Sequence, residues 1–269
     1  MERIRDHYLI EKELAARLSA ASKEERRHLY SAVYDELFER VPDHPQLSQK
    51  LNERLRRAEV RARLKLLQRY LHAETVYLEI GPGDCALAVE AARRVSRVFA
   101  VDVSRAIVSG ILLLKNLELV ISDGSSIPVP AASVNVAYSD QLMEHLHPDD
   151  AAEQLRNVYE SLAPGGVYIC ITPNRLSGPH DVSRYFDEVA TGFHLREYTV
   201  AELAQMFREA GFRNLRVLLG GKGTHISVPV SLIGNLERFL ESLPAGLGRK
   251  LARQLPLRAL LGAKLVGRK

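Results

Sequence analysis

From residue 75 onward, short β-rich runs alternate with helical stretches, and this alternation limits the possible fold more than any other feature of the chain. Strands and helices that alternate at such short spacing build βαβ units and therefore a parallel sheet. Because the crossovers are right-handed, a ligand site is expected outside the carboxyl ends of the strands. The expected strands are 75–80, 97–101, 117–121, 134–138 and 166–171, and the expected helices between them are 85–94, 104–115 and 149–162.

The far end of the sheet is expected to be antiparallel. A helical stretch over 199–210 stops at Gly211, and two more β-rich runs follow at 212–219 and 224–230. The glycine-rich segment 220–223 between these runs favours a hairpin turn. We therefore predict an α/β, Rossmann-like fold whose seven-stranded sheet is mostly parallel and closes with this hairpin.

Residues 1–72 predict a helical extension that precedes the central domain, 73–230. Apolar residues recur there at the helical spacings of three, four and seven. Ser22 and Glu25 have the pattern of a capping box, and a further helix is expected from about Pro45 to Tyr70. The extension could serve as a lid or packing layer, and a partner-binding or dimerising arm is the alternative.

The segment 231–269 is predicted as a basic amphipathic tail of helical stretches. It contains eight basic and two acidic residues, whereas 73–230 contains 13 basic and 19 acidic residues. The tail could pack on this acidic domain or lie on an anionic membrane surface. An acidic centre disfavours a nucleic-acid-binding face, so we expect no DNA partner. The expected helical stretches are 232–243, 247–255 and 257–266.

Composition excludes several classes of protein. With 46% hydrophobic and 26% charged residues, the 269-residue chain can form a core. It has no apolar run of about 18 residues, as a transmembrane helix would need. Its two cysteines, Cys85 and Cys170, exclude a disulfide scaffold and a multi-cysteine zinc site. Because no secretory signal is visible, we expect a cytoplasmic protein, with peripheral contact at the inner membrane surface if the tail binds lipid.

The segment 79–84 covers the end of the first expected strand and the loop after it. It contains two glycines and marks the candidate ligand site. Glycines allow a ligand to approach the backbone closely. Their spacing, with Asp102 about 20 residues further on, also satisfies the dinucleotide-binding fingerprint. However, Asp84 would place a carboxylate where a pyrophosphate should lie, and Pro82 removes a backbone donor. A ligand without phosphate therefore fits this loop better than NAD or a flavin.

Four motifs, taken in order, resemble those of class I S-adenosylmethionine-dependent methyltransferases. They are Glu79-x-Gly81-x-Gly83, Asp102 after the second strand, Asp123-Gly124 after the third, and Leu162-Ala-Pro-Gly-Gly before the fifth. The resemblance covers roughly residues 74–230 and implies S-adenosylmethionine as cofactor and methyl transfer as the reaction. Cys85 departs from the pattern, because many members have a third glycine at that position.

The resemblance also implies roles for the matched residues. The two glycines, Gly81 and Gly83, would pass beneath the methionine and ribose parts of the cofactor. Glu79 would orient the loop or the methionine amino group, and Asp102 would accept hydrogen bonds from both ribose hydroxyls. The adenine amino group would donate to Asp123, beside a backbone contact from Gly124. The sulfonium and the acceptor would face the end of the fourth strand, at Ser139, Asp140 and Gln141.

Histidines supply candidate bases for a hydroxyl acceptor. His145 is the first candidate and His194 the second, although a Glu-His pair at 144–145 could equally cap and pack a helix. His180 with Asp181 could form an oriented base or a polar turn. Some methyltransferases of this class bind a divalent metal through Glu-x-x-Glu-His. Here Gln141, a poorer ligand, replaces the first glutamate, so we expect no metal.

These patterns together favour O-methylation of a small-molecule, glycan or lipid-linked acceptor by in-line methyl transfer. The alternatives within the methyltransferases are N-, C- or RNA methylation. A non-catalytic S-adenosylmethionine-binding protein and an NAD-dependent oxidoreductase are the alternatives from other classes. The sequence identifies neither the acceptor nor the oligomeric state.

Overall fold

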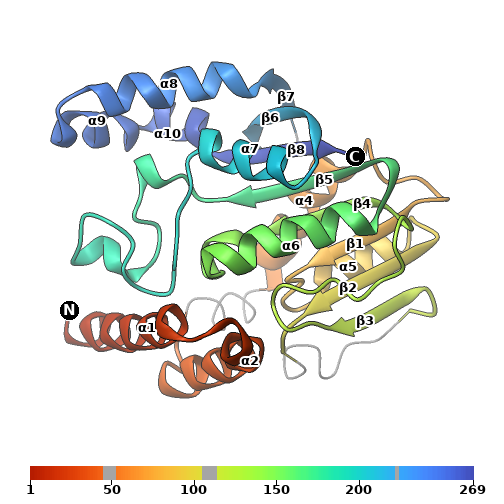
Figure 1. The fold of residues 1–269 in the computed structure, drawn as a ribbon, viewed down its shortest axis with the longest axis horizontal. Helices are drawn as coiled ribbons and strands as arrows, with labels where there is room; N and C mark the ends of the chain where they lie inside the picture. The colour runs from red at the N-terminus through yellow and green to blue at the C-terminus, as the bar shows by residue number, and fades with distance from the viewer. Residues whose placement is uncertain (45–52, 105–113, 222–223) are drawn as a thin grey trace.

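The computed structural model describes residues 1–44, 53–104, 114–221 and 224–269, and an eight-stranded sheet forms its centre (Figure 1). The strand order is β3-β2-β1-β4-β5-β8-β6-β7. The first five strands of this order run parallel, whereas β8 is antiparallel to both neighbours and β6 is antiparallel to β7. The strands are β1 (Val76–Ile80), β2 (Arg97–Asp102), β3 (Leu117–Ile121), β4 (Val134–Asp140), β5 (Leu162–Thr172), β6 (Arg213–Gly221), β7 (Thr224–Pro229) and β8 (Ala263–Arg268).

The predicted α/β class and the antiparallel end of the sheet are confirmed, but the described sheet has eight strands instead of seven. The extra strand, β8, comes from the segment predicted as a helical stretch over 257–266, so the second half of that prediction is wrong. β8 lies between β5 and β6, and its Leu265 and Val266 are buried in the apolar clusters on opposite faces of the sheet. A short strand buried on both faces lacks the polar alternation that would distinguish it from a helix.

Helices cover both faces of the sheet. α2, α6 and α7 pack with α1 against one face, and α4 and α5 pack against the other. Figure 1 shows α6 in front of the parallel strands, α4 and α5 behind them, and α8 to α10 together at the top. The helices are α1 (Glu2–Ala20), α2 (Lys23–Arg40), α4 (Glu53–Leu67), α5 (Ala86–Ala92), α6 (Pro148–Ser161), α7 (Val200–Glu209), α8 (Val230–Ser242), α9 (Ala245–Ala252) and α10 (Leu255–Leu261).

α2 is attached to the start of α6 by buried polar contacts. The Arg26 guanidinium donates two hydrogen bonds to the Asp150 carboxylate, at 2.6 and 2.9 Å. The Tyr30 hydroxyl donates to the same carboxylate at 2.7 Å and accepts the backbone N–H of His147 at 2.9 Å. The capping box that the sequence predicts at Ser22 begins α2. These contacts fix α2 beside the carboxyl ends of the parallel strands.

Several predictions lie partly outside the described residues. They are the start of the helix at Pro45, most of the helix over 104–115, and positions 222–223 of the hairpin turn. The division of the chain at residues 72 and 230 stays a prediction. Among the described helices, none combines the length and the apolar character needed to cross a membrane.

Candidate active site

A cavity of about 350 Å³ lies at the carboxyl ends of β1, β2 and β4, where α2 and α4 also contribute to its lining. This is the edge at which parallel sheets of this kind bind ligands. Eight residues that the sequence predicts for the site line the cavity: Glu79, Gly81, Gly83, Asp102, Gly124, Asp140, Gln141 and His145.

The loop after β1 presents its backbone to this cavity. Gly81 and Gly83 have φ angles of +67° and +55°, which side chains of L-residues rarely allow. A Cβ atom added at Gly83 would meet none of the residues that the structure describes within 4 Å, so the space above it is open to them. Cys85, at the position where the resemblance expected glycine, also has a positive φ of 55°. The backbone therefore keeps the conformation that glycine would favour there, although Cys85 has a side chain.

Carboxylates provide much of the polar lining. Burial raises the pKa of Glu79 to about 8, although the positive charge of Arg63 opposes the shift. Asp140 accepts a hydrogen bond from Arg63 at 2.7 Å and another from the Tyr138 hydroxyl at 3.0 Å. The Asp102 carboxylate accepts a hydrogen bond from the backbone N–H of Ser104 at 3.1 Å. Acidic groups thus surround the open glycine loop.

The charges of the lining fit S-adenosylmethionine, which carries a sulfonium and no phosphate. Its two arginines, Arg56 and Arg63, form ion pairs with Asp84 and Asp140. A pyrophosphate would have to compete with these carboxylates for the arginines. A cationic ligand would instead gain from the negative carboxylate of Asp102.

Two residues of the predicted set are directed elsewhere. The Ser139 hydroxyl is buried and lies 2.7 Å from the Tyr168 hydroxyl. The Asp123 carboxylate accepts the backbone N–H groups of Ser125 and Ser126, at 3.1 and 2.8 Å. It therefore closes the turn after β3, and its contact with adenine stays a prediction.

His145 lies in the short helix η1 (Met143–His145), which follows β4. Its ring lies beside that of Tyr34, which also lines the cavity. Its Nδ1 is 2.9 Å from the carbonyl oxygen of Phe193, and its ring is 6.2 Å from that of Tyr34, centroid to centroid. Burial and the neighbouring charge of His194 lower the pKa of His145 to about 3. Because a carbonyl only accepts hydrogen bonds, Nδ1 carries the proton of the neutral ring and Nε2 carries the lone pair.

His194 lies against His145, with ring centroids 4.8 Å apart, but it is not among the residues that line the cavity. Its Nδ1 is 2.8 Å from Glu197. Burial lowers the pKa of His194, but the Glu197 hydrogen bond and the charge of Glu144 outweigh that effect and raise it overall. His194 therefore adds positive character next to the neutral His145 ring.

The pair at 180–181 is divided between two environments. His180 lines a smaller cavity of about 200 Å³, which shares Gln141 with the first, and its Nδ1 is 3.2 Å from Glu197. Asp181 accepts the backbone N–H groups of Ser183 and Gly192, at 3.1 and 3.0 Å. This geometry corresponds to the polar-turn alternative for Asp181.

Glu144 is fully buried beside the two histidines of the site. One of its carboxylate oxygens accepts the Thr172 hydroxyl at 2.9 Å, and the other has no hydrogen-bond partner among the described residues. Burial raises the pKa of Glu144 to about 7. Ligand atoms of Glu144, His145 and His194 lie within 4.8 Å of one another, so this group could hold a divalent metal ion. The expectation that the motif around Glu144 and His145 holds no metal stays a prediction.

Sequence analysis missed several residues of the lining. Tyr34 and Phe38 on α2 and Gln154 on α6 lie far along the chain from the glycine loop, and no motif marked them. Within the part of the chain that the structure describes, the buried amide oxygen of Gln154 has no hydrogen-bond partner, while its nitrogen donates to the carbonyl of Gly124 at 2.6 Å. Only the helical period of α2 hinted that Tyr34 and Phe38 share a face.

Residues 51–217 match the model of a methyltransferase domain family. A protein of Mycolicibacterium smegmatis, named a probable S-adenosylmethionine-dependent methyltransferase, is 38% identical over 88 residues, which are 33% of this chain and 32% of that protein. A protein of Mycobacterium tuberculosis with the same description is 31% identical over 136 residues, 50% of this chain and 47% of that protein. The chain thus spans about a third to a half of the length of these relatives.

A solved structure of an S-adenosylmethionine-dependent methyltransferase from Mesorhizobium loti has the same fold. It superposes with a TM-score of 0.51 at 16% identity, over 76% of this chain and 96% of that one.

Proposed function

The chain belongs to the S-adenosylmethionine-dependent methyltransferases, and we propose that it methylates a hydroxyl oxygen of a small acceptor that is free, part of a glycan or linked to a lipid. The observation that carries this proposal is His145. It is a neutral histidine that lines the cavity, and the Phe193 carbonyl fixes its tautomer.

A weak base is sufficient for this reaction. S-adenosylmethionine supplies, when bound, a methyl group on a positively charged sulfur. As the acceptor oxygen forms its bond to carbon, its O–H proton becomes strongly acidic, so even a base of low pKa can take it. His145 would accept that proton at Nε2, and the oxygen would retain the methyl group.

The residues at the strand ends would hold the cofactor. We assign the carboxylate of Asp102 to the ribose hydroxyls and Glu79 to the methionine amino group. Gly81 and Gly83 would lie beneath the ligand, because both line the cavity and, among the described residues, nothing fills the space that a Cβ at Gly83 would take. Gly124, Asp140 and Gln141 complete this proposed set.

The helices that line the cavity favour a small acceptor. Tyr34 and Phe38 from α2 and Val60 from α4 present aromatic and aliphatic surface to it. Such a lining suits the body of a small molecule, whereas a structured RNA would need an open basic surface. We therefore rank RNA methylation below methylation of a small acceptor.

The test compares His145→Ala with His28→Ala, since His28 is exposed on α2. Both proteins receive labelled S-adenosylmethionine and a small-molecule extract, and the methylated product is identified by mass spectrometry and NMR. We expect His145→Ala to lower kcat about 10²–10⁴-fold while S-adenosylhomocysteine still binds. Unchanged turnover would contradict the role of His145, and a methylated nitrogen or carbon would contradict O-methylation without affecting the family assignment.

We also propose that α8 to α10 contact an anionic membrane surface. Phe239 on α8 is 58% exposed and Leu255 on α10 is 82% exposed, and basic side chains such as Arg249 and Lys250 lie between them in the chain. Apolar side chains combined with basic ones suit binding to anionic lipid.

Because β8 is part of the sheet, truncation of the tail would damage the fold, and point variants are the better test of membrane contact. We expect the full chain to float with vesicles of anionic lipid and not with phosphatidylcholine alone. Leu255→Glu should reduce flotation, whereas a substitution at the exposed Leu9, Leu9→Glu, should not. Equal flotation of both variants and the parent chain would contradict the proposal.

A further inference from the structure

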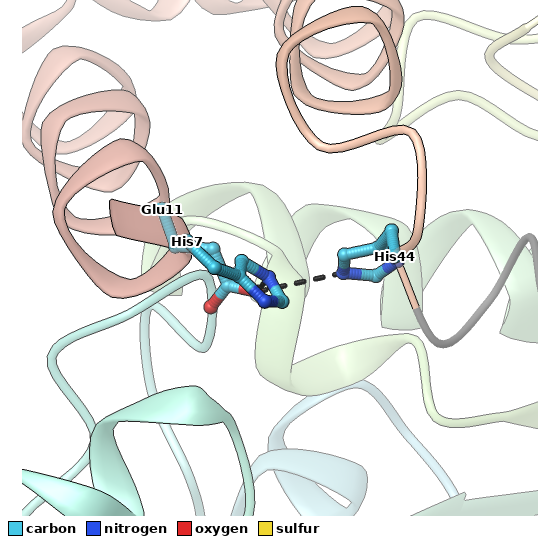
Figure 2. A group of neighbouring side chains, drawn as sticks. All are labelled: His7, Glu11 and His44. Atoms are coloured by element: carbon cyan, nitrogen blue, oxygen red, sulfur yellow. Dashed lines mark hydrogen bonds and ion pairs between the residues drawn. The ribbon is translucent and has the colours of Figure 1, made fainter. Parts of the chain in front are cut away.

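Two histidines and a glutamate converge at a place outside the cavity lining, where α1 meets the segment after α2. His7 and Glu11 lie one turn apart on α1, and His44 follows α2 (Figure 2). The Nε2 atoms of His7 and His44 are 2.7 and 3.5 Å from the same oxygen, Oε1 of Glu11. One ligand atom from each of the three residues lies within 4.8 Å of the others.

The surroundings of this cluster restrict its movement. The side chains of Glu11 and His44 are 5% and 10% exposed, and that of His7 is 16% exposed and gives access from solvent. The second oxygen of Glu11 accepts the backbone N–H of Phe193 at 2.9 Å. Contacts on both of its oxygens therefore hold the Glu11 side chain in one orientation.

We propose that His7, Glu11 and His44 bind a divalent transition-metal ion of the zinc type. Two imidazole nitrogens and one carboxylate oxygen form a donor set that zinc accepts, with a fourth position left for water. Ligand atoms about 2.0–2.1 Å from a tetrahedral ion lie roughly 3.3 Å from one another. The two distances to Glu11 fall on either side of this value, and the three ligand atoms lie within 4.8 Å of one another, so side-chain rotations that adjust these separations would complete the site.

A bound ion would connect the cluster to the active site through Phe193. The N–H of Phe193 donates to Glu11, and its carbonyl accepts from Nδ1 of His145. Hydrogen bonds of this kind orient metal ligands and are part of a metal site. An ion at the cluster would therefore fasten α1 to the segment after α2 and hold the Phe193 peptide in the position that orients His145.

The test uses Co²⁺ as a spectroscopic probe and Zn²⁺ for calorimetry, on the full chain after treatment with a chelator. We expect one equivalent of Co²⁺ to produce visible d–d absorption and Zn²⁺ to raise Tm. His7→Gln, Glu11→Gln and His44→Gln should each weaken binding by at least about 100-fold, because loss of a direct ligand exceeds the effect of its hydrogen-bonded neighbours.

Two variants serve as controls. The first, His28→Gln, changes an exposed histidine on α2 and should leave the Co²⁺ spectrum and affinity unchanged. The second, His194→Gln, changes the other group that could hold an ion and should also retain binding. His7→Gln alters the least buried ligand, and its Tm without metal shows whether it folds. Absence of the d–d band, or binding lost in His194→Gln and retained in His7→Gln, would overturn the proposal.

Discussion

The two halves of the cavity are built from different kinds of structure. The strand-end half consists of residues at the carboxyl ends of strands or in the loop after β1: Glu79, Gly81, Gly83, Asp102 and Asp140. The helical half consists of side chains from the N-terminal helices: Tyr30, Tyr34 and Phe38 on α2, and Arg56, Glu59, Val60 and Arg63 on α4.

The difference shows which half can recognise which ligand. The strand-end half offers backbone and carboxylates in positions set by the sheet, and such groups bind polar parts of a ligand. The helical half offers aromatic surface from α2 and both aliphatic and charged side chains from α4. Its position depends on contacts such as Arg26 with Asp150. We therefore expect changes in the first half to affect cofactor affinity and changes in the second to affect stability and acceptor choice.

The largest expected effect is the loss of cofactor binding in Asp102→Ala, in the strand-end half. Hydrogen bonds to a charged acceptor contribute about 1.5–3 kcal/mol each, so two ribose bonds correspond to roughly 10²–10⁴-fold in affinity. Calorimetry with S-adenosylhomocysteine measures the change. Asp149→Ala is the matched control, because Asp149 is 80% exposed and is not among the lining residues. Equal affinity of the Asp102→Ala variant and the parent would contradict the role of Asp102.

The second prediction concerns the pH dependence that Glu79 gives to the strand-end half. Its pKa is about 8 in the folded protein against 4.5 ordinarily, so the folded state binds the extra proton. Its contribution to the free energy of unfolding is fully present below about pH 4.5 and is lost as the pH rises through about 8. The total loss is at most about 5 kcal/mol. Urea unfolding between about pH 5 and about pH 9 should show that the free energy of unfolding falls more steeply with pH for the parent protein than for Glu79→Gln. Parallel curves would contradict the buried, protonated carboxyl.

The third prediction tests the attachment of the helical half. Asp150→Ala leaves the buried Arg26 without its partner and should reduce the free energy of unfolding by about 3–5 kcal/mol. The control Asp149→Ala changes a neighbouring carboxylate that is 80% exposed and should stay within about 0.5 kcal/mol of the parent. Urea denaturation measures both. A small effect at Asp150 would mean that apolar packing alone holds α2.

The smallest effect is expected for Ser22→Ala, which removes the N-cap of α2. Its hydroxyl accepts the backbone N–H of Glu25 at 3.3 Å, and loss of such a cap costs about 0.5–2 kcal/mol. Ser22→Thr keeps a capping hydroxyl and should stay close to the parent protein. If cofactor affinity fell more than stability in Ser22→Ala, the two halves would be more strongly coupled than we infer.

The accuracy of the sequence-based predictions follows the same division. The first five strands, the glycine loop and the capping box at Ser22 depend on neighbouring residues, and the structure contains each of them. β8 was missed, because what makes it a strand is the space between β5 and β6 and not its own pattern. His194 lies about 50 residues along the chain from Glu144 and His145, and the fold brings the three side chains together.

By itself, the sequence determined the parallel sheet, the edge at which a ligand binds and the acidic glycine loop at that edge. Short-range forces specify these features, since hydrophobic period, turn chemistry and helix caps act over a few residues. Only the tertiary structure decided that α2 lines the cavity, that His7 and Glu11 meet His44, and that Phe193 links this cluster to His145. Such contacts depend on how distant segments pack, and no local pattern in the chain records that packing.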